Sequence, residues 1–208
     1  MHDVSILMRC EKVKVALASL IGLEAVGNKN GKLFITPLGL QMSRLPLDPL
    51  SARVLLSSFE AGCSKEIIDL VSLLGQRDSL LFSSVATREA ADKARAKFSD
   101  RSGDHMMLLR ILRAFEEVPK SEQKQWCRDN FVNAKSMGNV FESRRQLKER
   151  CNRLKLDSEL SCGDDSETIL NTCITGLFAN TATLQPDGSY RQCMSRQVRF
   201  SLVPISCR

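Results

Sequence analysis

The sequence predicts a mainly α-helical protein. Apolar residues recur at spacings of three and four through most of the chain, which is typical of amphipathic helices. Short polar loops with glycine, proline and capping residues separate these stretches. Strand-like patterns are confined to a short stretch near residue 32 and to the end of the chain. With 208 residues and 43% hydrophobic content, the chain is long enough to bury a substantial core.

Residues 1–48 are predicted to form a small N-terminal unit with a winged-helix-like pattern. Apolar residues spaced along one helical face end near Gly22, at Val13, Ala16, Leu17 and Leu20. The polar turn GNKNG leads into a short strand over 32–36. Thr36 is placed to cap a second helix that begins with Pro37, a favoured first-turn residue.

Residues 49–156 are predicted to form a bundle of short helices with tight connections. Asp48 is expected to cap the first of them, and Gly62 to end it. The next helix is expected to run between Ser64 and Gly75 with one apolar face. Three further helices are expected to open at the capping residues Thr87, Asp104 and Ser121. Short loops between helices of this length are typical of a compact bundle.

The last predicted helix of the bundle is long and strongly basic. Its apolar residues share one face, at Met137, Val140, Phe141, Leu147, Cys151 and Leu154. Its cations lie mostly off that face, at Lys135, Arg144, Arg145, Lys148, Arg150 and Arg153. The pattern is compatible with a solvated amphipathic helix or with a surface that receives an acidic partner.

Residues 157–208 differ in character from the bundle. The acidic and serine-rich stretch at 156–167 predicts a boundary, and a short helix around 169–177 follows. The stretches TATLQ, SYRQCM and QVRFSLV, with PDG as a turn, predict strands of a hairpin or meander. Three short strands make a thin antiparallel sheet that needs the bundle for support.

Positive charge is concentrated in the middle of the chain. Residues 85–155 carry 17 Lys and Arg against 10 Asp and Glu, whereas the flanking thirds are nearly balanced. Such a concentration is expected of a protein with a polyanionic partner, and an acidic protein would also be attracted.

The chain offers no metal-binding or catalytic pattern. Its eight cysteines form no C-x-x-C pair, and both histidines are distant from them in sequence, so no metal site is expected. Several cysteines fall among apolar positions, which favours buried free thiols in a reducing compartment. His105 follows Asp104, but the stretch GDH is interpreted as a structural turn. The sequence contains no membrane-spanning run and no secretory signal, so neither membrane association nor secretion is expected.

The order of motifs resembles the C-terminal region of DEAH-box ATP-dependent RNA helicases. The matching pieces, in the family's order, are ALASLIGLEAV, GKLFITPLGLQMSRLPLDPLSARVLL, CSKEIIDLVSLL, GDHMMLL, QWCRDNFVNAKSM, RRQL and ITGLFANTATLQPDGSYR. The resemblance implies a winged-helix unit over 1–48, a helical ratchet bundle over 49–156, and a linker with a truncated oligonucleotide-binding (OB-like) β segment over 157–208. After DGSYR, the chain departs from the family's usual pattern.

The resemblance implies an RNA-binding accessory region acting in RNA unwinding or ribonucleoprotein remodelling. These 208 residues contain neither a G-x-x-x-x-G-K-[ST] phosphate loop nor a DEAH box, which in the parent family hold ATP and Mg²⁺. The chain is therefore expected to need no cofactor of its own, to be inactive as an ATPase by itself, and to be a fragment or truncated product. Implied partners are single-stranded RNA, helicase motor domains and an activator of the glycine-patch type. The implied compartment is the nucleus or nucleolus, with the cytoplasm as an alternative.

Six residues are candidates for contact with RNA, as the resemblance implies. Lys135, Arg144, Arg145 and Lys148 would meet phosphates from the ratchet side. Tyr190 would stack on a base and Arg191 would meet a phosphate from the β side. The alternative function is a motorless scaffold that binds helicase activators or other proteins.

Overall fold

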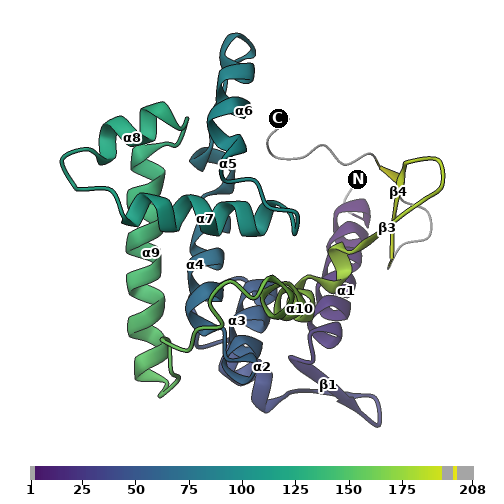
Figure 1. Cartoon of the computed structure of the whole chain (residues 1–208). Helices are drawn as coiled ribbons and strands as arrows, with labels where there is room; N and C mark the ends of the chain where they lie inside the picture. Colours follow the sequence, from purple (N-terminus) through teal and green to yellow (C-terminus); the bar gives the residue numbers. More distant parts are fainter. Residues whose placement is uncertain (1–2, 194–198, 201–208) are drawn as a thin grey trace.

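The structure, a computed structural model, describes residues 3–193 and 199–200 and is mainly helical (Figure 1). The α-helices are α1 (Asp3–Gly22), α2 (Pro37–Met42), α3 (Pro49–Ala61), α4 (Ser64–Leu74), α5 (Arg77–Leu80), α6 (Arg88–Ala96), α7 (Asp104–Glu116), α8 (Gln123–Asp129), α9 (Ala134–Arg153) and α10 (Ser166–Leu177). Two 3₁₀ turns, η1 (Val85–Thr87) and η2 (Phe178–Asn180), precede α6 and follow α10. The strands form an antiparallel pair, β1 (Val26–Lys29) and β2 (Lys32–Ile35), and a three-stranded meander, β3 (Ala182–Leu184), β4 (Tyr190–Gln192) and β5 (Arg199–Phe200). The prediction of a mainly helical chain with a short antiparallel sheet at its end is confirmed.

The first hairpin contains a strand that the sequence pattern missed. Strand β1 occupies part of the stretch predicted as a polar turn, and it pairs with β2 from Val26 to Lys29. The reversal itself needs only Asn30 and Gly31, which both adopt positive φ angles of 54° and 79°. Those angles suit a tight two-residue hairpin turn, for which Asn-Gly is a strong sequence signal. After β2, the Thr36 hydroxyl accepts a hydrogen bond from the Gly39 amide at 2.9 Å, so the predicted cap of α2 is confirmed.

Helix α4 is the centre of the bundle. Helices α3, α7 and α9 pack against it, and in Figure 1 α7 runs across the view over the upper end of α4. The sequence predicts one apolar face, but α4 is buried almost all round, including the side chains of Glu66 and Asp69. Because buried carboxylates need partners, this burial determines much of the surrounding polar structure.

Helix starts were predicted with mixed success. The Asp48 side chain accepts bonds from the Leu50 and Ser51 amides, and Gly62 ends α3 at a φ of 71°, both as predicted. The predicted cap at Asp104 is wrong, because Gly103 is the N-cap residue and Asp104 lies in the first turn of α7. Helix α8 begins at Gln123, two residues after the predicted Ser121. At these two starts, the cap residue makes no side-chain hydrogen bond to the helix.

The segment between α9 and α10 binds the first turn of α4. The Ser64 hydroxyl donates to the carbonyl of Asp157 at 2.7 Å, and the Ser161 hydroxyl donates to the Glu66 carboxylate at 2.5 Å. The Cys162 amide reaches the same carboxylate at 3.3 Å. A stretch predicted as a boundary is therefore tied to the bundle by hydrogen bonds.

Helix α10 packs on α3 at close range. A Cβ at Gly176 would lie 2.3 Å from the carbonyl oxygen of Leu50, so glycine is required for this approach. One hydrophobic core extends from Leu23 through the bundle to Cys173. The division at residues 48 and 156 stays a prediction. No helix in the described part of the chain is long and apolar enough to span a membrane.

Candidate nucleic-acid interface

Helix α9 is anchored by its predicted apolar face. Met137, Val140, Leu147 and Cys151 are buried, and α9 packs along α4. The Asn133 side chain caps the helix by accepting bonds from the Lys135 and Ser136 amides. Burial raises the pKa of the Cys151 thiol to about 11, as expected for a buried free thiol. This anchoring determines which way each cation of α9 points.

Arg144 points inward and is held by two carboxylates. Its Nε lies 2.7 Å from Oδ1 of Asp69 on α4, and its Nη1 donates to Glu116 on α7. The approach to Asp69 is an ion pair without hydrogen-bond alignment, and Oδ1 accepts no hydrogen bond from the described residues. The Arg144 and Asp69 side chains are 15% and 7% exposed. Arg144 therefore links three helices through a largely desolvated site.

The electrostatics of Asp69 reflect this burial. Desolvation raises the pKa of the Asp69 carboxyl to about 6, while the charge of Arg144 opposes the rise. The pKa of Arg144 is also shifted: burial lowers it, but the bond to Glu116 and the charge of Asp69 outweigh that and raise it overall. A phosphate could reach Arg144 only by competing with two carboxylates already in place.

Arg145 and Lys148 also have partners within the protein, but more exposed ones. Arg145 pairs with Glu142 at 2.7 Å and with Glu149, both on α9, and its side chain is 59% exposed. The hydrogen bond from Arg145 holds the pKa of Glu142 at about 2. Lys148 Nζ donates to Glu159 Oε1 at 2.8 Å, which ties α9 to the segment before α10. The exposed pairs of Arg145 contribute little to stability. Lys148 is only 25% exposed, and its pair joins two segments of the fold.

Lys135 is the most accessible of the four α9 residues that are predicted to contact RNA. It is exposed in the first turn of α9 and forms no ion pair with the described residues. The positive end of the helix dipole adds to its charge, which is unusual because carboxylates are favoured at this end. Lys135 is therefore available to an external anion.

Tyr190 and Arg191 lie apart from the α9 residues. They are neighbours on β4, opposite Leu184 and Thr183 of β3, so they point to opposite faces of the strand. Arg191 is exposed, whereas Tyr190 is half-buried. In Figure 1 the β3–β4 hairpin and α9 lie on opposite sides of the molecule, with α3, α4 and α10 between them. The six predicted residues therefore form two separate groups rather than one site.

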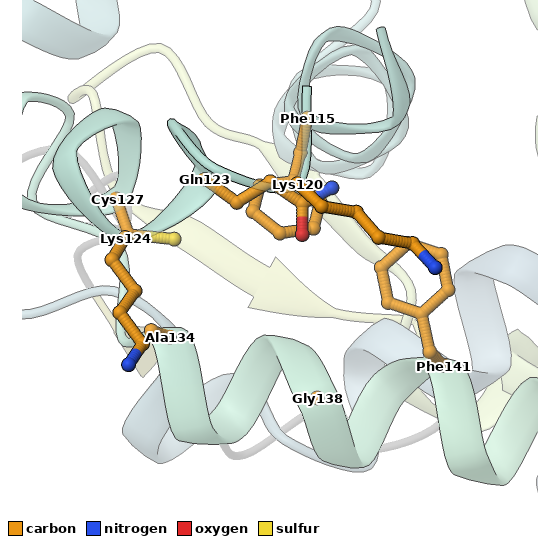
Figure 2. Close-up of a pocket in the computed structure, with 8 residues that line it drawn as sticks. All are labelled: Phe115, Lys120, Gln123, Lys124, Cys127, Ala134, Gly138 and Phe141. Carbon is orange, nitrogen blue, oxygen red and sulfur yellow. The ribbon is translucent and has the colours of Figure 1, made fainter. Parts of the chain in front are cut away.

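A groove that the sequence does not predict lies between α8 and the first half of α9 and is here called the α8–α9 groove. Its volume is about 410 Å³ (Figure 2). It is lined by Phe115, Lys120, Gln123, Lys124, Cys127, Ala134, Gly138 and Phe141. Phe115 belongs to an aromatic cluster in which its ring lies 5.5 Å from that of Trp126 and 5.8 Å from that of Phe141. Trp126 is half-buried and packs against the hydrophobic core.

Neither lysine of the groove is predicted from the sequence to be a binding residue. Lys120 lies in the loop before α8 and Lys124 in its first turn, so no single helical face contains both. Figure 2 shows the Lys120 side chain extending over the groove toward Phe141, and Lys124 lying beside Ala134. The sequence signal was limited to two lysines four residues apart. The two lysines line one groove because α8 packs against α9.

Comparison with known proteins identifies part of the bundle. Residues 48–108 match the family described as helicase associated domain (HA2), ratchet-like. The chain is 39% identical over 180 residues to the ATP-dependent RNA helicase DHX33 of Mus musculus, a match that covers 86% of this chain and 25% of the relative. It is 38% identical over 194 residues to DHX33 of Drosophila melanogaster, covering 93% and 27%. A probable ATP-dependent RNA helicase, a DHX35 homolog of Caenorhabditis elegans, is 35% identical over 157 residues, covering 74% and 21%.

The chain thus spans about a quarter of the length of these relatives. The comparisons support the resemblance to DEAH-box RNA helicases. Residues 48–108 thus match a ratchet-like helicase associated domain, and most of the chain is similar to part of several ATP-dependent RNA helicases.

Proposed function

We propose that this chain is the RNA-binding accessory region of a DEAH-box ATP-dependent RNA helicase. The observation that carries the proposal is the similarity to ATP-dependent RNA helicases over 86% or more of the chain in two relatives. The proposed parts are a winged-helix-like unit over 1–48, a ratchet bundle over 49–156, and a linker with an OB-like segment over 157–208. In this view, motor domains supply ATP hydrolysis and this region guides single-stranded RNA.

The accessible cations support a passive, electrostatic role. Lys135, Arg145 and Arg191 are exposed, so each can meet a phosphate without disturbing the core. We propose these three as phosphate contacts and Tyr190 as a stacking residue. For Arg144 and Lys148, contact with phosphate would require breaking ion pairs to other parts of the fold. We therefore propose that these two mainly support the interface rather than touch RNA.

A salt titration of the purified 208-residue chain with single-stranded RNA tests the proposal. Affinity is expected to fall steeply with salt because each neutralised phosphate releases counterions. Lys135→Glu combined with Arg145→Glu should weaken binding and flatten the salt dependence. The matched control is Lys29→Glu combined with Lys32→Glu on the β1–β2 hairpin, which makes the same charge change elsewhere. If both double variants weaken RNA binding equally, the assigned residues are wrong and the chain binds polyanions nonspecifically.

A protein-interaction role is the second candidate, and one surface favours it. The β1–β2 hairpin exposes the apolar side chains of Leu33, Phe34 and Ile35 beside a hollow of about 320 Å³ that includes Ile35 and Met42. We propose that helicase motor domains or a glycine-patch-type activator contact this unit. Ile35→Asp should abolish such binding while leaving RNA affinity unchanged. Loss of both would indicate that the variant is misfolded.

Localisation follows as a proposal from the same resemblance. We propose the nucleus or nucleolus as the compartment, with the cytoplasm as the alternative. Fluorescent tagging of the chain, alone and within a longer helicase chain, would distinguish these compartments.

A further inference from the structure

We propose that the α8–α9 groove binds a short acidic peptide segment by accepting one large apolar side chain. In this arrangement, carboxylates on either side of the apolar anchor contact Lys120 and Lys124. The groove would then be a protein-recognition site separate from the RNA contacts proposed at Lys135 and Arg145 of α9.

The shape and lining of the groove fit a single apolar anchor. A volume of about 410 Å³ is enough for an aromatic or large aliphatic side chain together with part of its backbone. The walls include the rings of Phe115 and Phe141, the Cys127 thiol and the backbone of α9 around Gly138. Burying an apolar side chain against these walls removes apolar surface of both partners from water.

The charge of the rim determines the chemistry of the partner. Lys120 and Lys124 are the charged residues that line the groove, and no carboxylate lines it among the described residues. Within that same part of the chain, neither lysine forms an ion pair. An anchor flanked by Asp or Glu would therefore find complementary charges at both sides of the groove.

A nucleotide base fits the groove less well. The edges of a base carry hydrogen-bonding groups that need partners once they leave water. Apart from the two lysines, Gln123 is the lining residue with a polar side chain, and its Nε2 already donates to the Val118 carbonyl at 3.2 Å. A buried base would leave most of its edge unsatisfied, whereas an apolar side chain has no such requirement.

Gly138 gives an independent reason to regard the groove as a binding site. Glycine inside a helix is unfavourable, and α9 extends several residues to either side of it. A Cβ at Gly138 would meet no atom of the described residues within 4 Å, so close packing does not require glycine. Its effect is to leave the middle of the groove open. Any larger side chain at this position would project toward the space that the anchor occupies.

The binding test uses the full 208-residue chain and a defined probe. The probe is a fluorescein-labelled peptide of twelve residues with one phenylalanine between runs of glutamate. Binding is followed by anisotropy and, with unlabelled peptide, by the emission of Trp126, the single tryptophan of the chain. Because the Trp126 ring packs on Phe115 in the groove wall, its emission reports on this site. Saturable binding with a change in Trp126 emission is expected.

Two peptide changes test the two parts of the recognition. Replacing the phenylalanine with alanine should weaken binding by about tenfold or more, as for loss of a buried anchor. Replacing the glutamates with lysines should abolish it. If the alanine peptide binds like the original, attraction is only electrostatic and the proposed groove site is wrong.

Two protein changes test the location. Gly138→Leu fills the groove and should weaken binding by about tenfold or more, whereas Gly138→Ala should have a much smaller effect. Lys120→Glu with Lys124→Glu should weaken binding by about fivefold or more, and the matched control Lys29→Glu with Lys32→Glu should not. Circular dichroism confirms that each variant is folded. Wild-type affinity in folded Gly138→Leu would overturn the proposal.

A single-stranded RNA of twelve nucleotides serves as the competing ligand. The proposal expects RNA binding to be unaffected by Gly138→Leu, because the groove is not its site. RNA that displaces the peptide, changes Trp126 emission and is lost with Gly138→Leu would make the groove a nucleic-acid site instead. Since the two ligands depend on different variants, failure here is distinguishable from failure of the proposed RNA-binding function.

Discussion

Arg144 of α9 and Asp69 of α4 form an ion pair with 2.7 Å between Nε and Oδ1, and both side chains are largely buried. Arg144 also donates to Glu116 of α7, so one guanidinium joins three helices of the bundle. The basic helix α9 therefore uses one of its central cations for the fold rather than for an external partner.

Replacing Arg144 should cost far more stability than replacing its neighbour. Arg144→Ala leaves the buried Asp69 without its counter-charge, and we expect a loss of about 3 kcal/mol in the free energy of unfolding. Arg145→Ala removes only exposed pairs within α9 and should unfold like wild type. Urea unfolding followed by circular dichroism measures both. Similar losses in the two variants would contradict the structural role of Arg144.

Asp69 should make stability depend on pH in an unusual direction for a carboxylate. Its pKa is raised by burial from 3.8 to about 6, so the folded state holds the proton more tightly than the unfolded state. Stability from this group is complete below pH 4 and falls as the pH rises through about 6. The loss approaches ~3 kcal/mol at most, since one pKa unit corresponds to about 1.4 kcal/mol.

The comparison that isolates this effect is between wild type and Asp69→Asn. As the pH increases from 4 to 7, the free energy of unfolding of wild type should fall relative to that of Asp69→Asn. A constant difference over that range would show that Asp69 titrates normally in the folded protein.

Gly176→Ala should destabilise the protein by separating α10 from α3. The added Cβ would lie 2.3 Å from the Leu50 carbonyl oxygen and 2.6 Å from Cγ2 of Val54, and the backbone cannot yield without moving a helix. Overpacking of this kind typically costs about 1–3 kcal/mol. Thermal unfolding should show a lower midpoint, and hydrogen exchange should increase in α10. An unchanged midpoint would mean that the two helices pack less closely than described.

The same substitution in α9 should have the opposite effect. Gly138→Ala places its methyl group in open space and removes the conformational freedom of glycine from the unfolded chain. We expect stabilisation of roughly 0.5–1 kcal/mol, as for glycine to alanine in an exposed helix interior. Urea unfolding alongside Gly176→Ala provides the comparison. A destabilised Gly138→Ala would indicate that the α8–α9 groove is narrower than its lining suggests.

Much of the local structure was predictable because its causes are local. Thr36 and Asp48 cap helices through side-chain oxygens two or three residues from the amides they bind. Gly62 ends α3 at a left-handed φ that other residues rarely adopt. At Gly103 and Glu122 no such bond forms, and there the predicted starts were wrong or displaced. Thr87 precedes α6 as predicted, although it makes no such bond.

The candidate site was less predictable because charge alone does not say where a side chain points. The sequence of α9 does not distinguish its four predicted RNA contacts, Lys135, Arg144, Arg145 and Lys148. In the described part of the chain, only Lys135 among them is both exposed and without an ion pair. Tyr190 and Arg191 share a strand but face opposite ways. The α8–α9 groove has no recognisable sequence pattern, since its lining comes from three helices, α7, α8 and α9, and from the loop between α7 and α8.

The sequence by itself determined most of the helices of this protein and its similarity to RNA helicases, because periodicity, caps and motif order are properties of neighbouring residues. The tertiary structure decided which cations remain accessible and where a groove opens. Those outcomes depend on how α9 lies against α4, α7 and α8. Asp69 meets Arg144 across 75 positions of sequence, and no local pattern could anticipate that contact.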